Sequence, residues 1–215
     1  MNPFSPTTLA LLGGAGKAGR PLVQAALQAG HAVRVLLRHP ALFSLQHKQL
    51  TVIEGDARDP DALRQLLAGS TALLSTLGNP RGENIPMLSA VTAQLLALLP
   101  ELGIRRYVTV TSLYDTGQPQ PDAATQQAAD YMQQHFPAFM ADRHRELALL
   151  TGSALDWTCV RLPFLVEGPA TGAVLTSLTH RPGPQITTAD LAQFLLRQLV
   201  SREFVGRAPF IANQA

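Results

Sequence analysis

Two hydrophobic patterns alternate along almost the whole chain. Short runs of mostly apolar residues, typical of strands buried on both faces, predict strands at Leu9–Leu12, Ala32–Leu37, Leu50–Glu54, Ala72–Thr76, Tyr107–Thr111, Trp157–Arg161 and Ala208–Ile211. Apolar residues three and four positions apart predict helices at Arg20–Ala29, Pro60–Ala68, Pro86–Leu102, Ala123–Gln134, Ala138–Leu150 and Thr188–Ser201. Because the two kinds of segment alternate, we expect an α/β fold with a doubly wound parallel sheet between two layers of helices.

The turn after the first predicted strand is rich in glycine. Residues 11–20 read Leu-Leu-Gly-Gly-Ala-Gly-Lys-Ala-Gly-Arg and lead directly into the first predicted helix. Glycines at 13, 16 and 19 let the backbone come close to an anionic ligand, and the helix N-terminus offers unpaired N–H groups and a positive dipole end. A strand before this spacing and a helix after it predict a site for the phosphates of a dinucleotide.

The end of the second predicted strand indicates which dinucleotide. An NAD site usually has an acidic residue there for the ribose 2′-hydroxyl, whereas this chain has Arg38. A guanidinium can hold a 2′-phosphate by charge-assisted hydrogen bonds. Residues 1–53 contain five Lys or Arg and no Asp or Glu. We therefore predict NADP(H) rather than NAD(H); the alternative is that Arg38 is a solvated residue at a strand end.

Composition limits the other classes of function. The chain has 215 residues, of which 46% are hydrophobic and 15% charged, with a net charge of +2. We expect one domain, residues 1–215, whose substrate side lies in the C-terminal region from about 156 to 215. Without an 18-residue apolar run or a secretory leader, and with Cys159 as the lone cysteine, a cytoplasmic protein with no membrane partner is expected. The small positive charge gives no argument for nucleic acid, and scattered histidines give none for a metal site. A monomer and a homodimer both remain open.

Two polar stretches interrupt the alternation. Residues 78–84 follow the fourth predicted strand, and residues 115–121 follow the fifth. Ligands of open α/β sheets bind beyond the carboxyl ends of the strands. We therefore expect both stretches to form mobile walls of a substrate cleft, although the second could equally be a linker.

Several motifs together resemble a known family. They are Gly13–Gly19, Arg38–Pro40, Glu54–Asp59, Leu155–Pro163 and Ile186–Ala192. In this order they resemble the atypical short-chain dehydrogenases/reductases. Within that group they are similar to the compact NAD(P)H-binding members related to biliverdin reductase B/flavin reductase and to NmrA-like proteins.

The resemblance implies a Rossmann fold that binds NADP(H) across the carboxyl ends of the strands. The loop residues Gly13, Gly14, Gly16, Lys17, Ala18 and Gly19 would lie at the phosphates, together with Arg38. Asp56 and Ala57 would border the adenine, and Ser75, Thr76, Leu77 and Gly78 the ribose. Thr111 and Ser112 would approach the nicotinamide, opposite Pro163 and Phe164. For Asp56, Thr76 and Lys17, simpler roles remain open: a turn residue, a local hydroxyl contact and a solvent-exposed cation.

The family's usual proton donor is absent from this sequence. Standard members use Tyr-x-x-x-Lys, in which lysine lowers the pKa of the tyrosine, but the only lysines here are Lys17 and Lys48. Three side chains remain as catalytic candidates, each with a structural alternative: Ser112, Tyr114 and His144. Asp142, Glu146 and Arg143 lie at helical pair spacings, which predicts salt bridges on the surface.

A complete cofactor motif without an acid–base pair favours one activity. We expect an NADPH-dependent oxidoreductase that transfers hydride to a small redox-active acceptor, such as a flavin, a quinone or a tetrapyrrole, because such an acceptor can take its proton from water. One alternative is a non-catalytic NADP(H) sensor of the NmrA-like type. Another is an NAD-dependent epimerase/dehydratase-like enzyme with an unusual acid.

Overall fold

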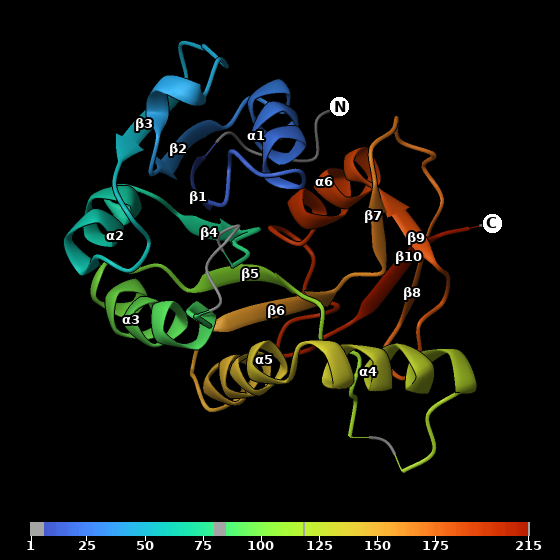
Figure 1. Cartoon of the computed structure of the whole chain (residues 1–215). Helices are drawn as coiled ribbons and strands as arrows, with labels where there is room; N and C mark the ends of the chain where they lie inside the picture. Colours follow the sequence, from blue (N-terminus) through green and yellow to red (C-terminus); the bar gives the residue numbers. More distant parts are fainter. Residues whose placement is uncertain (1–6, 80–84, 118, 215) are drawn as a thin grey trace.

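An eight-stranded sheet forms the middle layer of this computed structural model, which describes residues 7–79, 85–117 and 119–214 (Figure 1). The strand order is β3-β2-β1-β4-β5-β6-β10-β8. The strands are β1 (Thr8–Leu12), β2 (Ala32–Leu37), β3 (Leu50–Glu54), β4 (Ala72–Ser75), β5 (Arg106–Thr111), β6 (Asp156–Arg161), β8 (Val174–Ser177) and β10 (Phe210–Asn213). All neighbours pair in parallel except β8, which runs antiparallel to β10. The short strands β7 (Phe164–Val166) and β9 (Gln185–Thr187) form a separate parallel pair.

Helices cover both faces of the sheet. Helices α1 (Gly19–Gln28) and α6 (Thr188–Arg197) pack together on one face. On the other face lie α2 (Pro60–Leu67), α3 (Leu88–Glu101) and α5 (Pro137–Thr151). Helix α4 (Ala123–His135) follows β5 and lies beside α5, and a single 3-10 turn, η1 (Pro40–Leu42), follows β2. The doubly wound α/β fold predicted from the sequence is confirmed.

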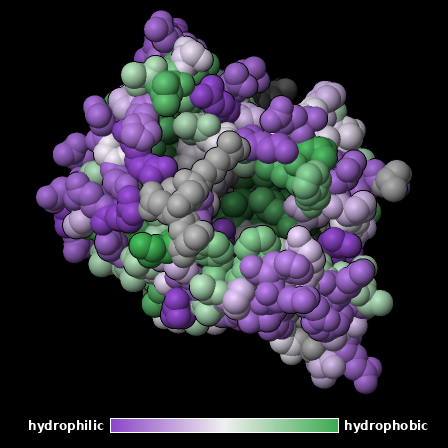
Figure 2. All heavy atoms as spheres, viewed as in Figure 1, coloured by the Kyte–Doolittle hydropathy of each residue, from purple (hydrophilic) through white to green (hydrophobic). Residues whose placement is uncertain are grey.

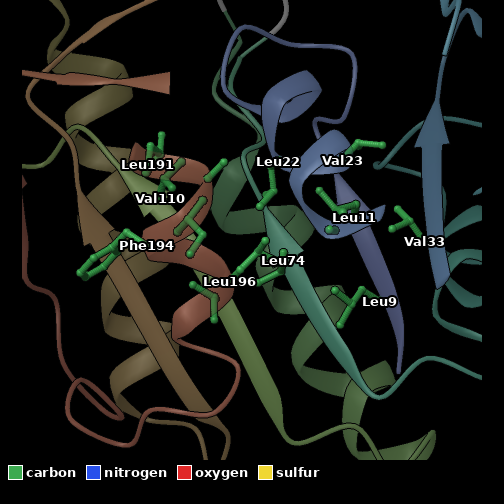
Figure 3. Close-up of a cluster of buried hydrophobic side chains, with 14 of the residues drawn as sticks. Leu9, Leu11, Leu22, Val23, Val33, Leu74, Val110, Leu191, Phe194 and Leu196 are labelled. Carbon is green, nitrogen blue, oxygen red and sulfur yellow. The ribbon is translucent and has the colours of Figure 1, made fainter. Parts of the chain in front are cut away.

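The two faces of the sheet contribute to two hydrophobic cores. Strand β1 shows how, because its successive side chains point to opposite faces. Leu9 and Leu11 pack with α1 and α6 (Figure 3), whereas Ala10 and Leu12 pack with α2 and α3. All four side chains are at most 1% exposed. A strand buried on both faces must be apolar at every position, which explains the continuous runs in the sequence.

The C-terminal third contains the elements that the sequence did not predict. Strands β7, β8 and β9 have three or four residues each, and most of their residues are exposed or half-buried. They lack both continuous apolar runs and strict alternation, because among their residues only Ile186 of β9 is buried. They carry the chain from β6 around the carboxyl end of the sheet and back to α6.

Helix α6 begins at Thr188, the residue predicted from the sequence. The residue before it, Thr187, caps the helix, because its hydroxyl accepts the hydrogen bond from the Asp190 backbone N–H, at 3.1 Å. Thr187 has an extended backbone at the end of β9, as a capping residue requires. The Asp190 carboxylate accepts hydrogen bonds from the backbone N–H groups of Thr171 and Gly172, at 2.8 and 3.0 Å. It therefore fastens the loop before β8 to α6.

The three charged residues of α5 for which surface salt bridges were predicted are buried, so that prediction was wrong. Asp142, Arg143 and Glu146 are 3%, 9% and 2% exposed. Helix α5 packs against α3. Asp142 and Glu146 hydrogen-bond to residues of α3, and Arg143 donates to the Val110 carbonyl oxygen of β5. Asp142 accepts hydrogen bonds from the Leu88 N–H and the Ser89 hydroxyl, at 2.9 and 2.5 Å, and so caps the N-terminus of α3.

Candidate functional site

A cleft of about 930 Å³ lies at the carboxyl ends of the central strands. Figure 2 shows a hollow with hydrophobic residues on its inner walls on the face that Figure 1 presents. Segments from the ends of β1, β2, β4, β5 and β6 reach this cleft, together with residues of α4 and α5. The strand order reverses at β1 and β4, where ligands of doubly wound folds bind.

The glycine-rich loop forms one end of the cleft. Gly13 has φ +77°, and a Cβ there would lie 2.6 Å from the backbone carbonyl of Thr76, so only glycine fits. Gly16, Lys17 and Ala18 line the cleft directly. Helix α1 then begins without a side-chain cap and without an acidic residue in its first turn. A bound phosphate would supply the missing acceptor for the helix N-terminus, so this loop fits a dinucleotide.

Three of the residues predicted at the cofactor do not line the cleft. Gly14 packs against the Val35 side chain, whose Cγ2 would be 2.3 Å from a Cβ added at position 14. A Cβ at Gly19 would lie 2.0 Å from the carbonyl oxygen of Gly13. These two glycines therefore allow close packing around the loop. The Ser75 side chain is buried and accepts a hydrogen bond from the Leu77 N–H at 3.3 Å.

The end of β4 holds the glycine-rich loop in place. Thr76 donates its hydroxyl to the carbonyl oxygens of Leu12 and Gly13, at 3.3 and 3.4 Å. The local role considered for this hydroxyl is therefore present, and Thr76 also lines the cleft with Leu77 and Gly78. Of the expected wall at 78–84, only residues 78 and 79 are described, and both line the cleft.

Charged residues line the nucleotide end of the cleft at the ends of β2 and β3. Arg38 is exposed and lines the cleft, as do Asp56 and Ala57. Arg58 holds Asp56 through its Nε at 2.9 Å and its terminal nitrogen at 2.6 Å. These hydrogen bonds lower the pKa of the Asp56 carboxyl, and the nearby charge of Arg38 lowers it further.

Lys17 spans the cleft between its two ends. Its Nζ donates to the Leu165 carbonyl oxygen at 2.6 Å and lies 5.7 Å from the centre of the Phe164 ring. Lys17 is exposed, as the simpler alternative had it, but its amino group is held by this contact. The contact joins the glycine-rich loop to β7, a pair of segments almost 150 positions apart in sequence.

The other end of the cleft contains most of the remaining predicted residues. Thr111, Ser112, Pro163 and Phe164 all line it, and the Thr111 hydroxyl accepts a hydrogen bond from the Leu113 N–H at 3.2 Å. Ser112 is half-buried. The side chains of β5 and of the β6–β7 connection thus meet across the cleft, as the resemblance implied.

Tyr114 and His144, the other two catalytic candidates, are placed differently. Tyr114 lines the cleft, but its hydroxyl donates to the Leu162 carbonyl oxygen at 2.8 Å, and burial raises the pKa of this phenol. His144 does not line the cleft; it lies at a separate cavity of about 250 Å³. Its Nε2 is 3.2 Å from a carboxylate oxygen of Asp115. His144 is thus not in position to act on a ligand in the cleft.

The second expected wall is formed by a different element. Residues 115, 116 and 121 of the stretch 115–121 line the small cavity at His144, and residue 118 lies outside the described residues. Helix α4 forms the wall of the main cleft instead, through Ala124, Gln127, Ala128, Tyr131 and Met132. Tyr131 was not among the residues predicted at the site.

Two arginines of the cleft were also missed. Arg143 projects from α5, and its terminal nitrogen lies 3.1 Å from a carboxylate oxygen of Glu146. Burial raises the pKa of Glu146, and the charge of Arg143 opposes that rise. Arg181 comes from the loop before β9. No local motif marks either residue, because each reaches the cleft through tertiary packing.

Two other expectations concern absences. Among the described residues, no three His, Cys, Asp or Glu side chains come together in an arrangement that could hold a metal ion. Within the same part of the chain, every helix is too short or too polar to span a bilayer. Cys159 is buried, and burial raises the pKa of its thiol, which agrees with a core residue.

The fold and the glycine-rich cleft together define an NAD(P)-binding protein of the Rossmann type. The sequence matches the NAD(P)H-binding family over residues 13–202, so the chain belongs to that family. This confirms the resemblance to atypical short-chain dehydrogenases/reductases that the motifs indicated.

Solved structures of other proteins share the fold. A wide-type short-chain dehydrogenase/reductase of Veillonella parvula in complex with NADP aligns with a TM-score of 0.81 at 17% identity, covering 98% of this chain and 96% of that one. ChuY, an anaerobilin reductase of Escherichia coli O157:H7, aligns with a TM-score of 0.79 at 19% identity, covering 96% and 97%. An oxidoreductase of Lactococcus lactis aligns with a TM-score of 0.74 at 16% identity, covering 96% and 91%.

Proposed function

We propose that the protein is an NADPH-dependent reductase that transfers hydride to a redox-active aromatic acceptor, such as a flavin or a quinone. The observation that carries the proposal is one continuous cleft, with a phosphate-binding loop at one end and largely apolar walls at the other. Binding, orientation and exclusion of water are what such a cleft supplies to hydride transfer.

The described side chains around the cleft support an acceptor that needs no protein acid. Neither lysine of the sequence can activate Tyr114, because Lys17 bonds to Leu165 and Lys48 does not line the cleft. The Tyr114 hydroxyl is already engaged with the Leu162 carbonyl, and its raised pKa makes it a weak proton donor. A flavin or quinone accepts the hydride and takes its proton from water, so that NADPH, the acceptor and one proton give NADP⁺ and the reduced acceptor.

Arg38 supports NADPH over NADH. It stands at the end of β2 and lines the cleft where the ribose 2′-position is expected. The one carboxylate among the described lining residues, Asp56, is held by Arg58. No described lining residue therefore offers an uncommitted carboxylate to a ribose 2′-hydroxyl.

The test is the oxidation of NADPH by the purified protein against a panel of flavins, quinones and biliverdin, with NADH in parallel. Saturable oxidation with one class of acceptor, faster with NADPH, is the expected result. A Gly13→Ala variant provides the control, because its added Cβ would collide with the Thr76 carbonyl and disturb the glycine-rich loop. Tight NADPH binding without turnover on any acceptor would overturn the reductase and favour the non-catalytic NADP(H) sensor.

A further inference from the structure

The acceptor end of the cleft combines apolar walls with a positive charge. Met132 and Tyr131 from α4 and Phe164 from β7 supply apolar and aromatic surface. Arg181, from the loop between β8 and β9, lines the same cleft and is half-buried. Apolar and aromatic surfaces of this kind suit a planar ring, and the guanidinium of Arg181 favours a ligand that also carries a negative charge.

Arg181 is fixed at both of its ends. Its backbone N–H donates to the Thr125 hydroxyl at 2.8 Å, and Thr125 is 1% exposed at the start of α4. Its guanidinium interacts with the Tyr114 hydroxyl, which in turn donates to the Leu162 carbonyl. The Tyr114 ring stacks on Phe210, with 6.1 Å between ring centres. The side chain is therefore positioned before any ligand arrives, which lowers the entropy lost on binding.

The other charges around the cleft are largely compensated or lie at the nucleotide end. Four cationic residues and one acidic residue line the cleft within the described part of the chain: Lys17, Arg38, Arg143, Arg181 and Asp56. Arg143 pairs with Glu146, and Asp56 pairs with Arg58. None of the described carboxylates forms a salt bridge with Arg181. The positive charge at the acceptor end thus has no acidic partner among these residues.

We infer that Arg181 binds an anionic group, a phosphate or a carboxylate, carried by the acceptor. The acceptor is then a planar redox-active ring with an acidic tail. That this ligand is reduced rests on the reductase proposal, whereas the binding of its anionic group to Arg181 does not. A half-buried guanidinium attracts an anion more strongly than a solvated one, because water screens the pair less. A ring without an anionic group offers this guanidinium no charge-assisted hydrogen bond.

Two flavins distinguish the contribution of the ring to binding from that of the acidic tail. FMN and riboflavin share the isoalloxazine ring, and FMN adds a phosphate. Their affinities for the NADP⁺-saturated protein can be measured from flavin fluorescence, with the nucleotide present to block the phosphate loop. We expect FMN to bind about 10- to 100-fold more tightly than riboflavin, the range of one or two charge-assisted hydrogen bonds.

Substitutions at Arg181 test the assignment. Arg181→Gln is expected to reduce the preference for FMN to less than about threefold, and Arg181→Lys to keep part of it. Arg202→Gln serves as the matched control and keeps the wild-type preference, because Arg202 is 74% exposed and pairs with Asp156 at the amino end of β6, away from the cleft. A naphthoquinone pair with and without a carboxylate repeats the comparison for a carboxylate tail. The pair with the larger ratio identifies the anion.

The binding measurement also separates this inference from the reductase proposal. Loss of the FMN preference in Arg181→Gln, without NADPH oxidation by the wild-type protein on any acceptor of the panel, would support the anion site and overturn the reductase. Arg181→Gln with an intact preference would overturn the anion site, whatever the turnover. Equal affinity of wild-type protein for both members of each pair, or no binding of any of them, would also overturn it.

Discussion

The two ends of the cleft differ in that backbone forms most of one surface and side chains form most of the other. At the nucleotide end, glycine backbone, a helix N-terminus and the ends of adjacent strands form the surface, and most of it lies within residues 12–57. At the acceptor end, side chains arrive from β5, α4, α5, the β6–β7 connection and the loop at Arg181, which span residues 110–181. The first surface depends on the local conformation of the chain, and the second on how distant elements pack.

This difference explains how each end can change. A backbone loop tolerates few substitutions, because glycine is needed wherever a Cβ would collide. Side chains on a helix such as α4 can be exchanged without altering the fold beneath them. We therefore expect substitutions at the nucleotide end to affect cofactor binding as a whole, and those at the acceptor end to affect one ligand or one packing contact at a time.

The exception, and the largest predicted effect, is Arg143 of α5. Arg143→Met leaves the Glu146 carboxylate buried, 2% exposed, without its cationic partner. Removal of one member of a buried ion pair destabilises a protein by about 3–5 kcal/mol. Urea unfolding measures this loss. The control is Arg145→Met on the same helix, where a 63% exposed side chain pairs with Asp142 at 3.6 Å and contributes at most about 1 kcal/mol.

The loss in Arg143→Met is expected to depend on pH. Burial raises the pKa of Glu146 in the folded protein, and without Arg143 the pKa rises further. Between the unfolded and folded pKa values only the native state keeps the proton, so stability falls as the pH increases. The variant should therefore lose less stability at pH 5 than at pH 8. A loss below about 1 kcal/mol, or one equal at both pH values, contradicts the buried pair.

The sequence predicted the nucleotide end far better than the acceptor end. Gly13 and Gly16 belong to a short motif between a strand and a helix, and Arg38 directly follows the next strand, so local spacing was enough to place them. Arg143 was misjudged as a surface residue, because helical spacing gives the relative faces of α5 but not which face meets α3 and the sheet. Arg181 was not found at all, since its position depends on the short strands β8 and β9, which carry almost no hydrophobic signal.

The second prediction concerns Gly13 at the nucleotide end. Gly13→Ala introduces a Cβ at φ +77° and 2.6 Å from the Thr76 carbonyl carbon. The strain and overpacking amount to about 2–4 kcal/mol, which is lost as folding stability or as NADPH affinity when the loop moves. Thermal unfolding without cofactor and an NADPH fluorescence titration measure the two parts. Gly168→Ala is the control, because the nearest atom to its added Cβ would be 3.6 Å away. Equal stability and NADPH affinity of the two variants would contradict the requirement for glycine at position 13.

The smallest predicted effect tests whether a side chain determines selectivity at the nucleotide end. Arg38→Ala should weaken NADPH binding about 10- to 100-fold, the value of one or two charge-assisted hydrogen bonds, and change NADH binding by less than about threefold. Parallel titrations with both nucleotides measure the ratio. Lys48→Ala is the control, since Lys48 is exposed, belongs to the same segment without acidic residues and does not line the cleft. An unchanged ratio in Arg38→Ala would make Arg38 a solvated strand-end residue, and nucleotide selectivity would then have to come from the backbone of the loop.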